Sequence, residues 1–173
     1  CLMSTPMSQA GQFKALVQWL GDAIRSPEQF TLGYNAEASQ FIRFNKGKVR
    51  QAGLVQQASL SLKLIDNGRH ADVSITLAGD PTVDQQRVSE ALQQLRDTLP
   101  LLPVDPYLLL NPEPWHSHNV QDQPLPDTAR VLEEISRSAE GIDLVGFYAS
   151  GPISYGYASS EGALGWHQAN SFN

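Results

Sequence analysis

Apolar residues recur at helical spacing in three parts of this chain. The first such part includes residues 13–24 and ends before Ser26-Pro27, because the residue before a proline is disfavoured in helical geometry. The second follows Asp80-Pro81 and the third follows Asp127, and both aspartates are typical helix caps. The residues expected to face a core are Phe13, Leu16, Val17, Leu20 and Ile24, then Val88, Ala91, Leu92, Leu95 and Leu99, then Val131, Leu132, Ile135 and Ala139.

Between the first two helices, apolar and polar residues alternate with the period of a β-strand. Two turns interrupt this pattern, at Lys46-Gly47 and at Asp66-Asn67-Gly68. A two-residue turn at Lys46-Gly47 would place Arg43 opposite Arg50. The core side of the strands is expected to carry Ile42, Phe44 and Val49, then Leu60, Leu62 and Leu64, then Val73, Ile75 and Leu77. These elements predict an α+β fold, with a mostly antiparallel meander and helices packed on one face.

The end of the chain has a second strand pattern. A β-rich run begins after Asp143, Gly151-Pro152 is expected to break it, and Ser160-Glu161-Gly162 is expected to turn the chain back toward Trp166. Phe147, Tyr155, Tyr157 and Trp166 are predicted to share one apolar face. Because a lone hairpin cannot bury its own face, we expect residues 142–173 to begin a following β-rich domain, after an α+β domain at 1–141.

An extended connector is predicted at about residues 100–126. This stretch holds seven prolines and shows no sustained periodicity. Trp115 within it is expected to anchor the connector to the domain.

Several of these segments resemble the TldD/PmbA family, whose members have been called modulators of DNA gyrase and zinc-dependent peptidases. The similar runs are FIRFNKGKVRQAG, LSLKLIDNGRHA, DLVGFYASGP, SSEG and WHQANSFN. The resemblance covers most of the chain from about Phe30 and is weakest between Pro100 and Pro126. It implies the amino-terminal portion of such a protein, acting with a homologous subunit in a homo- or hetero-dimer on a peptide substrate. It places the family's zinc motif beyond Asn173.

Composition narrows the class of protein. A hydrophobic share of 41% and a charged share of 17% are typical of a soluble globular chain. The net charge of −6 argues against a nucleic-acid-binding surface, and no apolar run is long enough to span a membrane. The single cysteine, Cys1, excludes an intrachain disulfide and fits a cytoplasmic location.

Candidate binding residues cluster on the first hairpin. Arg43, Lys46, Lys48 and Arg50 make up four of the chain's twelve basic residues. Of these, Arg43, Lys48 and Arg50 are candidates for binding an anion or a peptide carboxylate. The alternative, which we favour, is a solvated strand edge protected by charge.

Catalytic chemistry has little support in the sequence. His116 and His118 are spaced to face the same way, yet two ligands do not make a zinc site, so we expect loop histidines and no metal ligands or catalytic residues in this chain. Zinc is expected only in a longer parent protein. The sequence therefore predicts part of a TldD/PmbA-type peptidase or of its non-catalytic partner, inactive alone. The alternative is a peptide-binding or subunit-assembly module without chemistry of its own.

Overall fold

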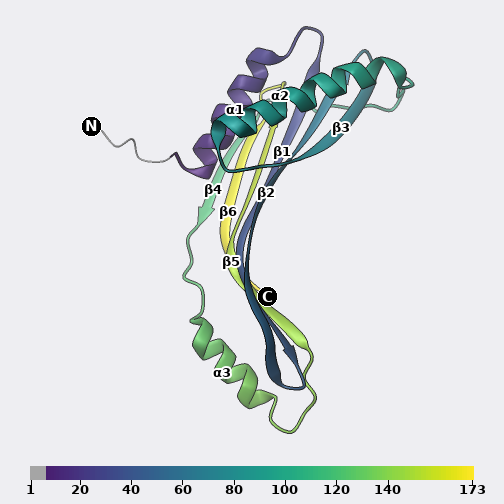
Figure 1. The fold of residues 1–173 in the computed structure, drawn as a ribbon. Helices are drawn as coiled ribbons and strands as arrows, with labels where there is room; N and C mark the ends of the chain where they lie inside the picture. The colour runs from purple at the N-terminus through teal and green to yellow at the C-terminus, as the bar shows by residue number, and fades with distance from the viewer. Residues whose placement is uncertain (1–6) are drawn as a thin grey trace. The chain divides into compact units, whose positions relative to one another are not determined.

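The computed structural model describes residues 7–173, so Cys1 lies outside the described residues. Six strands form one sheet in the order β3-β2-β1-β5-β6-β4, and the β2–β3 pair is antiparallel (Figure 1). The predicted α+β fold is confirmed. The elements are α1 (Gln9–Ala23), β1 (Gln29–Asn45), β2 (Lys48–Asp66), β3 (Arg69–Thr76), α2 (Pro81–Thr98), the 3-10 helix η1 (Leu99–Leu101), β4 (His116–Gln121), α3 (Thr128–Ser138), β5 (Gly146–Ser159) and β6 (Leu164–Phe172).

The chain divides into two compact units whose segments alternate along the sequence. The first unit comprises residues up to Asn35, Ala58–His118 and Tyr155–His167, and the second comprises Ala36–Gln57, Asn119–Ser154 and Gln168–Asn173. Strands β1, β2, β4, β5 and β6 each contribute residues to both units. The assignment of 142–173 to a following domain stays a prediction, although β5 and β6 belong to the same sheet as β1.

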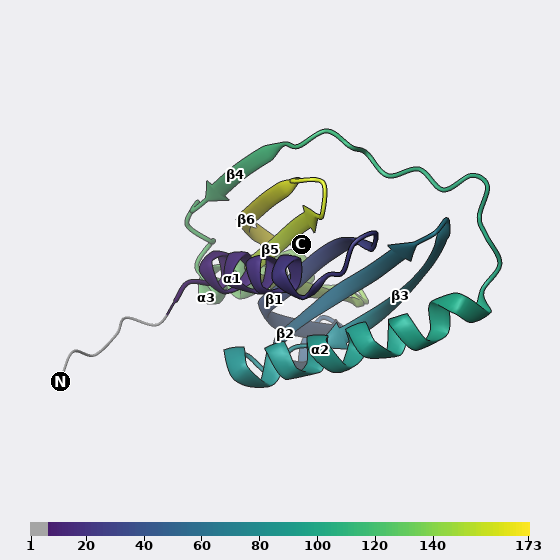
Figure 2. The same ribbon diagram turned by 90° about the horizontal axis from the view of Figure 1, so that it is seen from above.

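In the first unit, α1 and α2 cover one face of the sheet (Figure 2). Phe13 of α1 packs against Tyr34 and Trp166, with ring centroids 5.6 and 5.8 Å away. Its ring also lies over Gly156 of β5, where an added Cβ would come within 2.8 Å of a ring carbon. The strands bury Phe30, Leu32, Leu60, Leu62, Leu64 and Ile75 on this unit's core side, and α2 buries Val88, Ala91, Leu92 and Leu95.

Local capping explains where the helices start. Asp80 accepts hydrogen bonds from the backbone N–H groups of Thr82 and Val83 at the start of α2. Asp127 accepts one from Arg130 at the start of α3. Both caps were predicted from the sequence, and each satisfies donors that the first helical turn leaves free.

A second aspartate near the start of α2 is buried, which the sequence did not predict. Asp84 is 8% exposed and accepts hydrogen bonds from the backbone N–H groups of Ala78 and Gly79, at 2.6 and 3.1 Å. It therefore connects α2 by hydrogen bonds to the segment that follows β3.

Burial, with a smaller contribution from the negative charge of Asp84, raises the pKa of Tyr34.

The connector after α2 contacts the rest of the first unit near its start and again at Trp115. Near its start, Arg69 donates to the Leu102 carbonyl oxygen at 2.7 Å, and His70 lies 3.0 Å from the carboxylate of Asp105. Farther on, Trp115 stacks on Tyr157 with ring centroids 5.9 Å apart, as expected of an anchor. The connector is not wholly irregular, because its later part contains β4, a strand with all six residues exposed.

Glu28 and Arg96 form an ion pair that links the residue before β1 to α2 in the first unit. Their side chains are 12% and 14% exposed, and the closest N–O distance is 2.7 Å. The hydrogen bond from Arg96, opposed in part by burial, lowers the pKa of Glu28 below its ordinary value of 4.5. We therefore expect ionised Glu28 to make its full contribution to the free energy of unfolding above the pKa that this residue has in the unfolded chain. That contribution should be lost as the pH falls through its lower pKa in the folded protein.

The measurement is urea unfolding at a series of pH values from neutral to acidic. The midpoint of the wild type should fall more steeply below about pH 4.5 than that of Glu28→Gln, which has no proton to gain there. Identical slopes for the two proteins would contradict this assignment.

The second unit has its own small core under α3. Ile42, Phe44 and Tyr148 are buried together, and Val131, Leu132 and Ile135 of α3 pack against them with Leu144. The hairpin turn lies beside the end of α3, because an added Cβ on Gly47 would come within 3.6 Å of the backbone oxygen of Ala139. The Gly47 N–H also donates to the Leu144 carbonyl oxygen at 3.1 Å.

Three sequence predictions about the strands are wrong. Val49 is 47% exposed, because α3 packs over β1 and β5 and does not cover this part of β2. Gly151-Pro152 does not break the strand, since β5 runs from Gly146 to Ser159. Trp166 does not share an exposed face with Tyr155 and Tyr157: it is 5% exposed beside Phe13, whereas the two tyrosines are 45% and 39% exposed.

Candidate functional site

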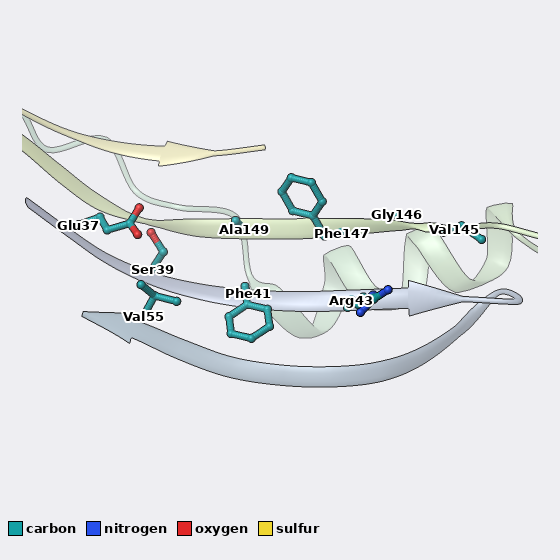
Figure 3. Close-up of a pocket in the computed structure, with 9 residues that line it drawn as sticks. All are labelled: Glu37, Ser39, Phe41, Arg43, Val55, Val145, Gly146, Phe147 and Ala149. Carbon is teal, nitrogen blue, oxygen red and sulfur yellow. The ribbon is translucent and has the colours of Figure 1, made fainter. Parts of the chain in front are cut away.

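An open groove lies on the sheet of the second unit. Its volume is about 480 Å³ and three strands line it (Figure 3). The lining residues are Glu37, Ser39, Phe41 and Arg43 of β1, Val55 of β2, Val145 just before β5, and Gly146, Phe147 and Ala149 of β5. Most of these side chains are apolar or absent, while Glu37, Ser39 and Arg43 add polar groups along one strand.

Strand geometry explains why these side chains lie together. Successive side chains of a strand point to opposite faces, so Phe41 and Arg43 face away from Ile42 and Phe44. The latter two are buried under α3, as is Tyr148, whose neighbour Phe147 remains 66% exposed. The groove is therefore on the sheet face of this unit opposite α3.

The register between β1 and β2 has an irregularity beside the groove. Lys46 and Gly47 both have positive φ, at 52° and 63°, as a two-residue hairpin turn requires. An uninterrupted ladder from that turn would put Val55 beside Ala38, on the α3 face. Instead Val55 lines the groove with Ser39 and Phe41.

Other contacts agree with one extra residue on β2. Gln57 donates to Glu37 at 2.7 Å, and an added Cβ on Gly53 would come within 2.7 Å of the Phe41 ring. We infer a β-bulge between the turn and Gly53, a feature that re-aims side chains next to it. Whether Arg43 faces Arg50 depends on where the bulge lies, so that pairing stays a prediction.

The two charged side chains of the groove, Glu37 and Arg43, differ in their interactions with the rest of the protein. Glu37 accepts the hydrogen bond from Gln57 on one carboxylate oxygen. Among residues 7–173, Arg43 forms no ion pair, and the ion pairs found join His70 to Asp105, Arg96 to Glu28 and Arg130 to Glu134. Within the described part of the chain, the groove thus presents a guanidinium without an ion-pair partner beside apolar side chains.

The structure places only one of the three predicted binding residues in the groove. Arg43 lines it, whereas Lys48 and Arg50 are exposed on β2 and do not. The sequence prediction missed Phe41, Val55 and Phe147. Phe41 and Phe147 alternate with buried neighbours along their strands, and this alternation could have identified them. Val55 faces the groove because of the inferred bulge, for which the sequence has no comparable signal.

His116 and His118 were expected in a loop, but both lie in β4, within the first unit. His116 and His118 line a hollow of about 280 Å³ together with Lys14 and Trp166. Within residues 7–173, no group of three or more histidine, cysteine, aspartate or glutamate side chains is arranged to hold a metal ion. The zinc ion implied by the family resemblance does not fit these residues, and the expectation that its ligands lie outside this chain stays a prediction.

The fold defines a class: an α+β sheet with the strand order and helix placement described above. Several solved structures have a similar fold. TldE from Thermococcus kodakarensis matches with a TM-score of 0.68 and 12% identity, over 93% of this chain and 37% of that one. A candidate modulator of DNA gyrase from Bacteroides thetaiotaomicron matches with a TM-score of 0.60 and 17% identity, over 92% of this chain and 38% of that one.

A candidate modulator of a DNA gyrase from Thermotoga maritima also matches, with a TM-score of 0.52 and 10% identity over 93% of this chain and 37% of that one. The resemblance predicted from the sequence is thus confirmed at the level of the fold, and this chain spans well under half the length of these proteins. No protein-family model matches the sequence, and no curated protein matches it.

None of the helices in residues 7–173 is both long and apolar enough to cross a bilayer.

Proposed function

We propose that this chain is the amino-terminal portion of a cytoplasmic TldD/PmbA-type protein and that its own role is to hold an extended peptide in the groove of the second unit. Its parent would be a zinc metallopeptidase or the non-catalytic partner of one, working as a dimer. Two lines support the wider proposal: the family resemblance of the sequence and the shared fold.

The observation that carries the binding role is the groove itself. It is shallow, lined by Phe41, Val55 and Phe147, and bordered by polar groups of β1. Exposed aromatic side chains on a rigid sheet are typical anchors for a bound chain, because they bury a large area with little loss of side-chain entropy. An extended peptide presents alternate side chains to a surface at the spacing of the strand beneath it.

The test is fluorescence anisotropy with a labelled unstructured peptide carrying leucine at alternate positions. We expect Phe147→Ala to weaken binding about tenfold, because it removes an aromatic anchor. Phe172→Ala is the matched control: this side chain is 61% exposed in the same unit, against 66% for Phe147, yet it does not line the groove.

Two further outcomes bear on the proposal. Equal binding by wild type and both variants would show that the peptide does not occupy the groove. Sedimentation over a range of protein concentrations tests the alternative role, because self-association abolished by Phe147→Ala would favour subunit assembly through this surface.

A further inference from the structure

We propose that the groove selects its peptide by charge, with a carboxylate of the peptide at Arg43 and a cationic group at Glu37. This inference rests on the proposed function. It adds the class of peptide: an extended segment with an acidic and a basic group at opposite ends and apolar side chains between them.

Arg43 provides the first recognition group. It lines the groove next to apolar side chains and has no ion-pair partner among residues 7–173. A guanidinium binds a carboxylate through paired N–H donors, and this attraction strengthens where nearby apolar groups displace water. A carboxylate on the bound peptide would supply the counter-charge that residues 7–173 do not.

Glu37 provides the second group, at the other end of the lining residues of β1 (Figure 3). Its Oε1 atom accepts from Gln57, which orients the carboxylate toward β2. An ionised carboxylate accepts several hydrogen bonds, so its remaining capacity is available to a lysine or arginine of the peptide.

Spacing sets the pattern of the peptide. Glu37 and Arg43 lie on one face of β1, which gives a separation of about 20 Å along an extended strand. An extended peptide of about seven residues covers that span. Its first and last side chains reach the charged groups, and the alternate side chains between them lie over Phe41 and Phe147.

The experiment is a double-mutant cycle between protein and peptide. The probe is a labelled peptide, Asp-Ser-Leu-Ser-Leu-Ser-Lys, with both termini blocked, and its neutral counterpart carries asparagine for aspartate. With wild-type protein we expect the neutral peptide to bind about threefold more weakly, as for a partly exposed ion pair. With Arg43→Gln the two peptides should bind equally.

The matched control is Arg137→Gln, which removes the same charge from α3, away from the groove lining. It should keep the threefold preference. A second cycle pairs Glu37→Gln with a peptide that carries glutamine for lysine, and it should show a preference of the same order.

A further arm separates two sources of the carboxylate. This arm uses a peptide of reversed sequence, in which asparagine replaces aspartate and stands last, with a free terminal carboxylate. If Arg43 binds any carboxylate, this peptide should again bind more tightly than the neutral peptide. If only the peptide with the aspartate side chain binds more tightly than the neutral peptide, Arg43 recognises an acidic residue and not a chain terminus. Either result supports the inference, provided that Arg43→Gln abolishes the preference.

The outcomes distinguish this inference from the function on which it rests. If charged and neutral peptides bind wild type equally, or if Arg43→Gln weakens both to the same extent, charge selection is wrong and the groove still binds peptide. If neither peptide binds, the proposed function itself fails.

Discussion

Replacing Gly151 with alanine should destabilise the protein by about 3 kcal/mol or more. Gly151 lies within β5, and its position leaves no room for a side chain. An added Cβ would overlap the carbonyl oxygen of Ala38 and come within 2.8 Å of the Cα of Ser39. These are backbone atoms of β1, so relief requires the two strands to move apart.

Urea unfolding of Gly151→Ala and Gly146→Ala measures this effect. Gly146 is the matched control because it is in the same strand and an added Cβ there would meet nothing within 4 Å. The control should unfold close to the wild type. Equal midpoints for both variants would show that β1 and β5 are not as close as described.

The second large effect is expected at the ion pair of the first unit. Arg96→Met should cost about 3 kcal/mol, because it leaves Glu28 as a largely buried charge without its partner. It also removes the hydrogen bond from Arg96 to the Ala23 carbonyl oxygen at the end of α1.

Two comparisons by thermal or urea unfolding isolate this contribution. Arg130→Met breaks an exposed pair on α3, with side chains 72% and 59% exposed, and should cost less than about 0.5 kcal/mol. Glu28→Leu with Arg96→Met should recover part of the loss, since no buried charge remains. Similar losses for Arg96→Met and Arg130→Met would contradict the buried pair.

Elements defined by local chemistry were predictable from the sequence. The starts of α2 and α3 follow from Asp80 and Asp127, whose side chains cap the helices that come directly after them. The turn at Asn67-Gly68 follows from residues that tolerate positive φ, and both have it. These features depend on a few neighbouring residues, and periodicity supplies the rest.

Features that depend on distant segments were not predictable in the same way. Val49 has the pattern of a core residue, but only the extent of α3 decides whether its side of β2 is covered. β4 shows no alternation because none of its residues is buried. From the sequence, Asp84 has the pattern of a solvent-exposed helix residue. Its burial depends on the segment after β3, which places two backbone N–H groups beside its carboxylate.

The candidate site shows both cases. Arg43 was singled out as a basic hairpin residue, and it lines the groove. The groove itself requires β5 to lie beside β1, which joins residues about a hundred positions apart in the sequence. Composition and residue spacing do not indicate that β5 lies beside β1. The sequence of the hairpin alone therefore favours the interpretation as a solvated strand edge.

Chemical-shift mapping by NMR tests the central claim most directly, that an extended peptide occupies the groove of the second unit. On titration with the unlabelled peptide Asp-Ser-Leu-Ser-Leu-Ser-Lys, the amide signals of Phe41, Val55 and Phe147 should shift, while those of Leu62 and Leu92 in the core of the first unit should not. Shifts confined to the first unit, or to the Lys48–Gln57 edge of β2 without Phe41 and Phe147, would contradict it.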